Sequence, residues 1–229
     1  MSANTPAETR ELTATERAER QRAVVQALGR VLPQDAILYT PEDTTPYECD
    51  GLTAYRERPL VVALPETEAQ VQAVLKACHA LQVPVVARGA GTGLSGGAMP
   101  HRLGVTLSMA RFNQIKTVDP VSRTAVVQCG VRNLAISEAA APYGLYYAPD
   151  PSSQIACTIG GNVAENSGGV HCLKYGLTVH NVLKVKGFTI EGDPIEFGSD
   201  ALDTSGYDLL AVLVGSEGML AVTTEVTVK

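Results

Sequence analysis

The residues of this chain that are best suited to bind a ligand are glycines and small hydroxyl residues, gathered in two short segments. Five of the 21 glycines lie between residues 89 and 97, and five more lie between residues 160 and 176. Glycine-rich backbone has little side-chain bulk and presents its N–H groups, so it can approach a ligand closely and surround phosphate oxygens. Both segments are therefore candidate binding segments.

The first segment, residues 88–97, reads RGAGTGLSGG and contains two overlapping motifs. It matches G-x-G-x-x-G, typical of Rossmann nucleotide sites, and G-x-S-x-G, which would make Ser95 the nucleophile of a hydrolase. Both motifs require a helix directly after the loop. The loop is followed instead by Gly97, Met99-Pro100 and Gly104, which do not favour a helix, and then by another predicted strand. Both functions are therefore disfavoured alternatives.

A phosphate-binding loop is the interpretation that remains for residues 88–97. Arg88 supplies a positive charge at the entrance of the loop, and Thr92 and Ser95 offer hydroxyl donors. An ordinary surface turn is the alternative, but the loop follows the apolar stretch PVVA directly. This position at the end of a predicted strand favours binding.

The second segment, residues 149–169, reads PDPSSQIACTIGGNVAENSGG. Its paired glycines at both ends of a short helix-capable stretch predict backbone pressed against a flat group, whose heteroatoms Thr158 and Asn162 can contact. A third glycine turn, Gly215–Gly218, leads into a strand. Two cradles about sixty residues apart fit one long cofactor better than two small ligands.

The elements that must position these segments begin with a β-α-β pattern. Residues 1 to about 12 are expected to form a loose polar arm. A helix to about residue 29 follows the capping pair Thr13 and Glu16. Residues 33–59 contain four prolines and predict an extended connector. A strand at 60–64, a helix capped by Thr67 and a strand at 84–87 then lead into the first glycine loop.

Beyond that loop the pattern predicts short strands joined by tight turns, and therefore an antiparallel sheet. Helices are expected at 133–140 and 207–214. The strands are expected at 104–108, 115–118, 124–128, 182–190 with an interruption at Gly187, 195–197 and 221–228. The predicted class is α+β, with two subdomains meeting near residues 110–120.

Composition excludes several other kinds of protein. With 45% hydrophobic and 18% charged residues, the chain is not a disordered polyelectrolyte, and a net charge of −6 without a basic block disfavours nucleic-acid or anionic-membrane binding. No run approaches the roughly 18 apolar residues of a membrane span. Five widely spaced cysteines and four histidines predict neither a disulfide framework nor a metal site, and the cytoplasm is the expected location.

Three stretches, residues 84–97, 149–169 and 215–223, resemble the FAD-binding domain of the vanillyl-alcohol oxidase (PCMH) type. Within that family the chain is similar to the FAD-linked subunits of glycolate oxidase and to D-2-hydroxyacid dehydrogenases, from about Tyr47 to Lys229. The resemblance implies an N-terminal helix and connector at 1–55 and an FAD-binding domain at 56–229. Its parts would be a small α/β subdomain, about 56–112, and a larger antiparallel-sheet subdomain, 113–229, with the substrate (cap) domain missing.

The resemblance also implies roles for the matched residues. The first loop would hold the FAD pyrophosphate, the second segment would line the flavin ring and ribityl chain, and the third turn would close over the cofactor. The first loop lacks the histidine that tethers flavin in some members, so FAD is expected to be non-covalent, and Cys157 an ordinary packed thiol. The expected cofactor-binding residues are Arg88, Gly89, Ala90, Gly91, Thr92, Gly93, Leu94, Ser95, Gly96, Pro149, Asp150, Ser153, Cys157, Thr158, Gly160, Gly161, Asn162, Gly168, Gly169, Glu217, Gly218 and Val222.

The activity implied by the resemblance is oxidation of a small 2-hydroxyacid, such as glycolate or D-lactate, by hydride transfer to FAD. Substrate-binding groups of the family come largely from the cap domain, so no residue of this chain is assigned as a catalytic base. The implied partners are the acid substrate and other oxidase subunits, an iron–sulfur protein among them, through which the protein could associate with a membrane. A non-catalytic flavin-binding module is the alternative.

Overall fold

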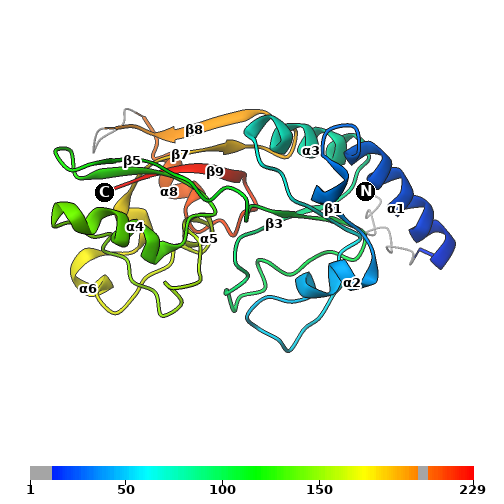
Figure 1. Cartoon of the computed structure of the whole chain (residues 1–229), viewed down its shortest axis with the longest axis horizontal. Helices are drawn as coiled ribbons and strands as arrows, with labels where there is room; N and C mark the ends of the chain where they lie inside the picture. The colour runs from blue at the N-terminus through cyan, green and yellow to red at the C-terminus, as the bar shows by residue number, and fades with distance from the viewer. Residues whose placement is uncertain (1–11, 201–205) are drawn as a thin grey trace, which may run out of the picture.

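The structure is a computed structural model that describes residues 12–200 and 206–229. It contains a four-stranded sheet in the order β1-β2-β4-β3 and a five-stranded sheet in the order β5-β6-β9-β7-β8. The first sheet lies with the N-terminal helices at one end of the molecule, and the second sheet extends toward the C-terminus at the other end (Figure 1). The predicted α+β class is confirmed. Nearly all of the expected polar arm lies outside the described residues.

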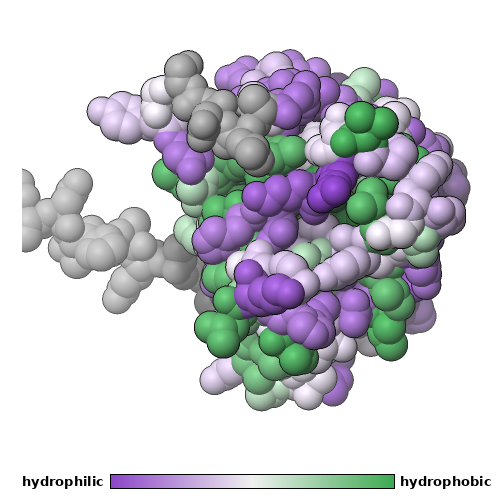
Figure 2. Space-filling model, turned by 90° about the vertical axis from the view of Figure 1, so that its left-hand side faces the viewer, coloured by the Kyte–Doolittle hydropathy of each residue, from purple (hydrophilic) through white to green (hydrophobic). Residues whose placement is uncertain are grey.

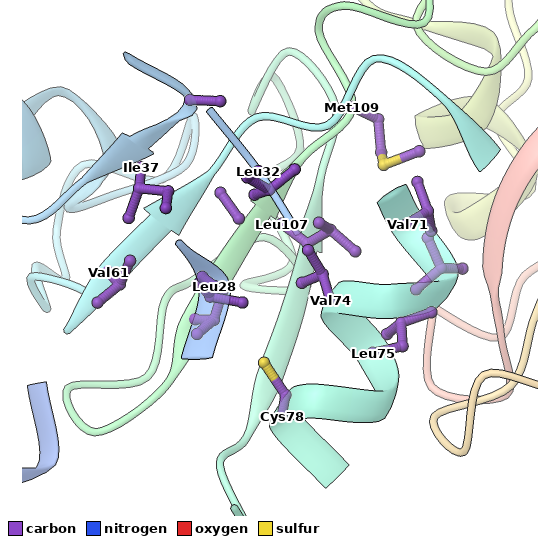
Figure 3. Close-up of a cluster of buried hydrophobic side chains, with 14 of the residues drawn as sticks. Leu28, Leu32, Ile37, Val61, Val71, Val74, Leu75, Cys78, Leu107 and Met109 are labelled. Carbon is purple, nitrogen blue, oxygen red and sulfur yellow. The ribbon is translucent and has the colours of Figure 1, made fainter. Parts of the chain in front are cut away.

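Two capped helices cover the first sheet, and both follow from local sequence. In α1 (Ala14–Leu28) the Thr13 hydroxyl accepts the Glu16 N–H and the Glu16 carboxylate accepts the Thr13 N–H. The same capping box starts α3 (Glu68–Ala80), with Thr67 and Gln70. The side chains on the inner face of α3 point toward β2 and β4, as Figure 3 shows. This cluster includes Leu28, Val61, Val71, Val74, Leu75, Cys78 and Leu107, all buried.

The strand at 104–108 does not join the antiparallel run in which the sequence placed it. As β4 (Val105–Ser108) it lies between β2 (Val61–Ala63) and β3 (Val85–Arg88) and pairs with both in parallel. All four of its residues are buried, and such a strand requires the centre of a sheet. The first glycine loop is therefore the connection from β3 to its neighbour β4, and it contains no helix.

The prediction that residues 33–59 form an extended connector is wrong in part. This segment contains two 3₁₀ turns, η1 (Gln34–Ala36) and η2 (Thr45–Tyr47), an edge strand β1 (Ile37–Leu38), and the short helix α2 (Pro41–Thr44). The prolines start helical turns here instead of extending the chain: Pro41 occupies the first position of α2, and the Thr40 hydroxyl caps it by accepting the Asp43 N–H.

The second sheet is antiparallel throughout, as predicted. Its strands are β5 (Ile115–Asp119), β6 (Thr124–Gln128), β7 (Val182–Phe188), β8 (Pro194–Gly198) and β9 (Val222–Val228). Gly187 does not interrupt β7. The register of β7 against β9 shifts there, and a Cβ on Gly187 would fall on the Val222 carbonyl oxygen. The glycine therefore lets two continuous strands approach closely.

The remaining helices lie on the side of the second sheet that is below it in Figure 1. They are α4 (Asn133–Ala140), followed by η3 (Ala141–Tyr143), then α5 (Ile159–Glu165), α6 (Cys172–Tyr175), α7 (Thr178–Asn181) and α8 (Leu209–Leu213). Of these, α4, α5 and α8 contact the strands of the sheet. Ile136, Ile159 and Leu213 form one buried cluster with Val185 and Val226 of the strands. The helix-capable stretch between the paired glycines forms α5, and the segment from 166 to 169 that follows it is not helical.

The surface at the C-terminal end of the molecule is mixed in polarity. Figure 2 shows separate groups of hydrophobic side chains among hydrophilic ones at this end. In the segment around α6, Val170 and Leu173 are 85% and 99% exposed. None of the helices in the described part of the chain is both long enough and apolar enough to span a bilayer.

Candidate functional site: a glycine-lined cleft between the two sheets

A cleft of about 320 Å³ is lined by residues from both sheets and their loops. The loop after β3 forms one wall, the start of α5 with the segment before it forms another, and the turn that leads into β9 closes the third. The two glycine segments, about sixty residues apart in the sequence, are brought together here as the sequence predicted. The predicted residues that line the cleft are Arg88, Gly89, Ala90, Gly91, Thr92, Gly93, Leu94, Ser153, Cys157, Thr158, Gly160, Gly161, Asn162, Glu217, Gly218 and Val222.

Two glycines give the first loop its shape. Gly91 and Gly96 have φ values of +70° and +86°, in the left-handed region that favours glycine. A Cβ on Gly91 would overlap the Arg88 guanidinium, and a Cβ on Gly89 would overlap the Thr158 hydroxyl. The loop is therefore packed against its own arginine on one side and against the residue preceding α5 on the other.

Arg88 is a buried cation at the base of this loop. Its Nη1 donates to the Cys49 carbonyl at 2.7 Å and to the Ala98 carbonyl at 3.5 Å, and its Cζ lies 5.6 Å from the centre of the Tyr47 ring. Burial lowers the pKa of the guanidinium, while the Cys49, Tyr47 and Asp50 groups raise it. An arginine stays protonated in proteins, so the cleft retains a fixed positive charge.

The wall formed by α5 carries two polar groups that have no hydrogen-bond partner among the residues that the structure describes. Thr158 and Asn162 are 7% and 2% exposed, and neither the Thr158 hydroxyl nor Asn162 Nδ2 has a hydrogen-bond partner in the described residues. The two residues lie one helical turn apart, so they fall on one face of α5. A buried polar group without a partner costs about 1–3 kcal/mol. This wall is therefore suited to a ligand with hydrogen-bonding heteroatoms.

The third turn is docked on the end of α5. The Gly215 N–H donates to the Val163 carbonyl and the Glu217 N–H to the Ala164 carbonyl, both at 2.8 Å. Glu217 and Gly218 both have positive φ, +55° and +75°. This backbone turns sharply at the cleft before entering β9.

Glu165 is a functional candidate that the sequence reasoning missed. It lines the cleft, and its Oε2 accepts a hydrogen bond from the Ser95 hydroxyl at 3.2 Å, which joins α5 to the first loop. Helical spacing from Gly161 and Asn162 would have found it. Other lining residues outside the prediction are Ala87, Gly97, Ala98, Met109, Cys129, Ala164, Ser167, Ala221 and Thr223.

Six of the predicted residues do not line the cleft: Ser95, Gly96, Pro149, Asp150, Gly168 and Gly169. Asp150 Oδ2 lies 2.5 Å from His171 Nδ1. Desolvation raises the pKa of the Asp150 carboxyl, but its hydrogen bonds with His171 outweigh that effect, and the pKa is lowered overall. A Cβ on Gly169 would overlap Asp150, so this glycine permits the close packing of the two segments.

The two cysteines in the cleft are protonated thiols. Burial raises the pKa of Cys129 to about 12 and also raises that of Cys157. Neither thiol is therefore an activated nucleophile. All five cysteines are free, and no group of three or more His, Cys, Asp or Glu side chains within residues 12–200 and 206–229 could hold a metal ion.

Comparisons with known proteins identify the relatives of this chain. Residues 59–198 match the family described as FAD binding domain. The chain is 66% identical over 207 residues to the glycolate oxidase subunit GlcD of Escherichia coli K12, which covers 90% of this chain and 42% of the relative. It is also 41% identical over 170 residues to D-lactate dehydrogenase of Archaeoglobus fulgidus. This match covers 74% of this chain and 38% of that relative. The chain thus spans less than half the length of these relatives.

The fold is shared with solved structures of lower sequence identity. Alkyldihydroxyacetonephosphate synthase superposes with a TM-score of 0.80 at 22% identity, over 91% of this chain and 40% of that one. A variant of Phl p 4, a glucose dehydrogenase, superposes with a TM-score of 0.75 at 18% identity, over 90% of this chain and 43% of that one. These likenesses concern the fold alone.

Proposed function

Because the chain belongs to the family of FAD binding domains, we propose that it forms the cofactor-binding part of a flavin-dependent oxidoreductase that oxidises a small 2-hydroxyacid. The observation that carries this proposal is the cleft itself. Glycine backbone from the loop after β3, from α5 and from the turn before β9 meets there, beside a buried arginine and two buried polar side chains that have no partner in the described residues.

The residues of the cleft fit FAD in chemistry. The first loop and Arg88 offer N–H groups and positive charge for the diphosphate. Thr158 and Asn162 offer the heteroatoms of the flavin polar groups that are unpartnered within residues 12–200 and 206–229, and the glycines leave room for a flat ring. FAD supplies the hydride-accepting ring, whereas the protein binds it, orients it and keeps water from one side of it. No histidine stands in the first loop, which supports non-covalent binding.

The substrate class comes from the names of the relatives. They are a glycolate oxidase subunit, D-lactate dehydrogenase and D-2-hydroxyglutarate dehydrogenase of Xanthomonas citri, all named for 2-hydroxyacids. Because the chain spans only about two fifths of those proteins, we assign the substrate pocket and the proton-accepting group to the part of their length that it does not span. Division of the described chain into subdomains at about 56–112 and 113–229 stays a prediction.

Partners and location belong to the same proposal. The E. coli relative is named a subunit, which supports assembly with further oxidase subunits, and an iron–sulfur protein is the one that we expect. Five free thiols, two of them partly exposed, suit the reducing cytoplasm.

The test is reconstitution of the purified chain with FAD. We expect a bound flavin with an absorbance band at about 450 nm, the property of the cofactor that the cleft is proposed to hold. Protein that stays colourless and cannot be reconstituted would overturn the proposal. Dye reduction with glycolate or D-lactate then tests whether this chain contains the substrate site. We expect little or no turnover by this chain, and robust turnover would place the substrate site within it.

A further inference from the structure

The first glycine loop rests on a segment that precedes the matched family region. Residues 47–52 lie before residue 59, where the match to the FAD binding domain family begins, yet they touch the loop through backbone and side chains. The sequence placed this segment in an N-terminal connector, outside the binding domain. Its contacts with the loop give it a part in shaping the cleft.

Asp50 makes the most direct of these contacts. Its side chain is buried, with 4% of the residue exposed. Oδ2 accepts the N–H of Gly96 at 3.0 Å, and Oδ1 accepts the N–H of Leu52 at 2.9 Å. One carboxylate therefore holds the far end of the glycine loop and the backbone of its own turn together. Hydrogen bonds to a charged acceptor are stronger than those between neutral groups.

The backbone next to Asp50 is pressed against the same loop. The Gly51 N–H donates to the Gly93 carbonyl at 2.9 Å. A Cβ on Gly51 would lie 2.8 Å from the Thr92 carbonyl oxygen and 2.9 Å from that of Gly93. Only a glycine fits this contact without displacing the loop.

Arg88 completes the support from below. It ties the Cys49 carbonyl to the base of the loop, while the ring of Tyr47 lies against its guanidinium. A Cβ on Gly91 would overlap the guanidinium, so the middle of the loop lies directly on Arg88. The near end, the middle and the far end of the loop are thus each held by the segment 47–52 or by the arginine that binds it.

We propose that Asp50 is a positioning residue, which holds the glycine loop in its diphosphate-binding shape before FAD binds. A loop of five glycines in nine residues loses much conformational freedom when it is ordered. By satisfying the Gly96 N–H, Asp50 keeps the loop folded in the cofactor-free protein, so the cofactor does not have to order it. The inference rests on the proposed binding of FAD.

The experiment compares Asp50→Ala and Asp50→Asn with a matched control. Asp119 is the control, because its carboxylate also accepts two backbone N–H groups, of Val121 and Ser122, in a turn that does not line the cleft. For each variant the dissociation constant of FAD is measured by fluorescence titration. The melting temperature of the cofactor-free protein and the absorbance spectrum of the bound flavin are measured as well.

We expect Asp50→Ala to raise the Kd of FAD about tenfold or more, which corresponds to about 1.4 kcal/mol. Asp50→Asn keeps one acceptor oxygen for one of the two N–H groups, so it should raise the Kd less. Asp119→Ala should leave the Kd unchanged. The spectrum of the bound flavin should match the wild type, since Asp50 contacts the far end of the loop at Gly96 and does not itself line the cleft.

Wild-type affinity in Asp50→Ala and Asp50→Asn would overturn the inference. Should Asp50→Ala fail to fold, the isosteric Asp50→Asn decides: an unchanged Kd overturns the positioning role, and a raised Kd with a native melting temperature supports it. A wild-type chain that binds no FAD would instead refute the proposed function, an outcome that the variants do not produce.

Discussion

In the proposed complex with FAD, we expect Thr158 and Asn162 to contribute to binding most directly. Each buries a polar group that finds no partner in the described protein, at the wall formed by α5. A group of this kind destabilises the free protein and strengthens the complex with a ligand that satisfies it. Removing it should therefore change protein stability and ligand affinity in opposite directions.

Thr158→Val tests whether stability and FAD affinity change in opposite directions, because valine replaces the hydroxyl with a methyl group of similar size. We expect the free energy of unfolding without FAD to stay the same or rise by up to about 1 kcal/mol, and the Kd of FAD to rise about tenfold. Urea denaturation and FAD titration measure the two quantities. Thr117→Val, on an exposed position of β5, serves as the control. A Thr158→Val protein with wild-type affinity would contradict the assignment.

Two buried thiols predict a loss of stability in alkaline solution. Burial raises the pKa of Cys78 and of Cys129 from 9.0 to about 12. The folded state therefore favours the protonated thiol, and its contribution is complete below pH 9 and is lost as the pH rises toward 12. Urea denaturation at a series of pH values should show this decline. The Cys129→Ala protein should lose less of its free energy of unfolding over this pH range. The same loss as in the wild type would contradict the raised pKa of Cys129.

The helix α5 connects the site to the second sheet, and its two adjacent glycines have different surroundings. A Cβ on Gly160 would lie 2.8 Å from the Cβ of Cys129 and 3.0 Å from its carbonyl oxygen, so this glycine permits close packing. A Cβ on Gly161 would meet only the Thr158 hydroxyl, at 3.5 Å, and would project at the cleft. One helix therefore presents a packing face and a binding face at neighbouring positions.

Alanine substitutions at Gly160 and Gly161 should separate the effect of close packing from the effect of ligand binding. Gly160→Ala should lower the free energy of unfolding by about 1–3 kcal/mol, because the new Cβ overpacks against Cys129. Gly161→Ala should raise it by roughly 0.5–1 kcal/mol, since glycine weakens a helix, while weakening FAD binding by crowding the cleft. Thermal denaturation and FAD titration of both proteins measure these effects. The same response from both would contradict the assignment.

Across the molecule, the cleft lies where the two sheets meet, so a ligand held there contacts both halves of the fold. The hydrophobic core is continuous across the same region, because Phe188 and Val222 of the second sheet belong to the cluster beneath the first. Binding should therefore stabilise the whole described chain and not one sheet alone.

FAD should raise the melting temperature in a concentration-dependent way. At a free concentration of 100 times the Kd, mass action adds about 2.7 kcal/mol to the free energy of unfolding. Hydrogen exchange should slow in the first glycine loop, in α5 and in the turn before β9. The Thr158→Val protein, at the same FAD concentration, should show a smaller shift. Protection confined to one sheet would contradict a site between the two.

Local patterns in the amino-acid sequence were sufficient for α1, α3 and the glycine segments. The pairs Thr13–Glu16 and Thr67–Gln70 mark helix starts, because capping involves residues three apart, and the clustering of glycine marks backbone that lines the cleft. The antiparallel pairs β5–β6 and β7–β8 also followed, since strands joined by tight turns pair with each other, but the entry of β9 between β6 and β7 did not.

Contacts between distant residues were beyond such patterns. Strand β4 enters the first sheet between β2 and β3, the Ser95 hydroxyl reaches Glu165, and Asp50 reaches Gly96. These contacts depend on strand order and on the path of the chain through space, which spacing along the sequence does not specify. Residue types therefore predicted a long phosphate-containing ligand, and the family resemblance predicted FAD, but the shape of the site and the residues that support it required the folded chain.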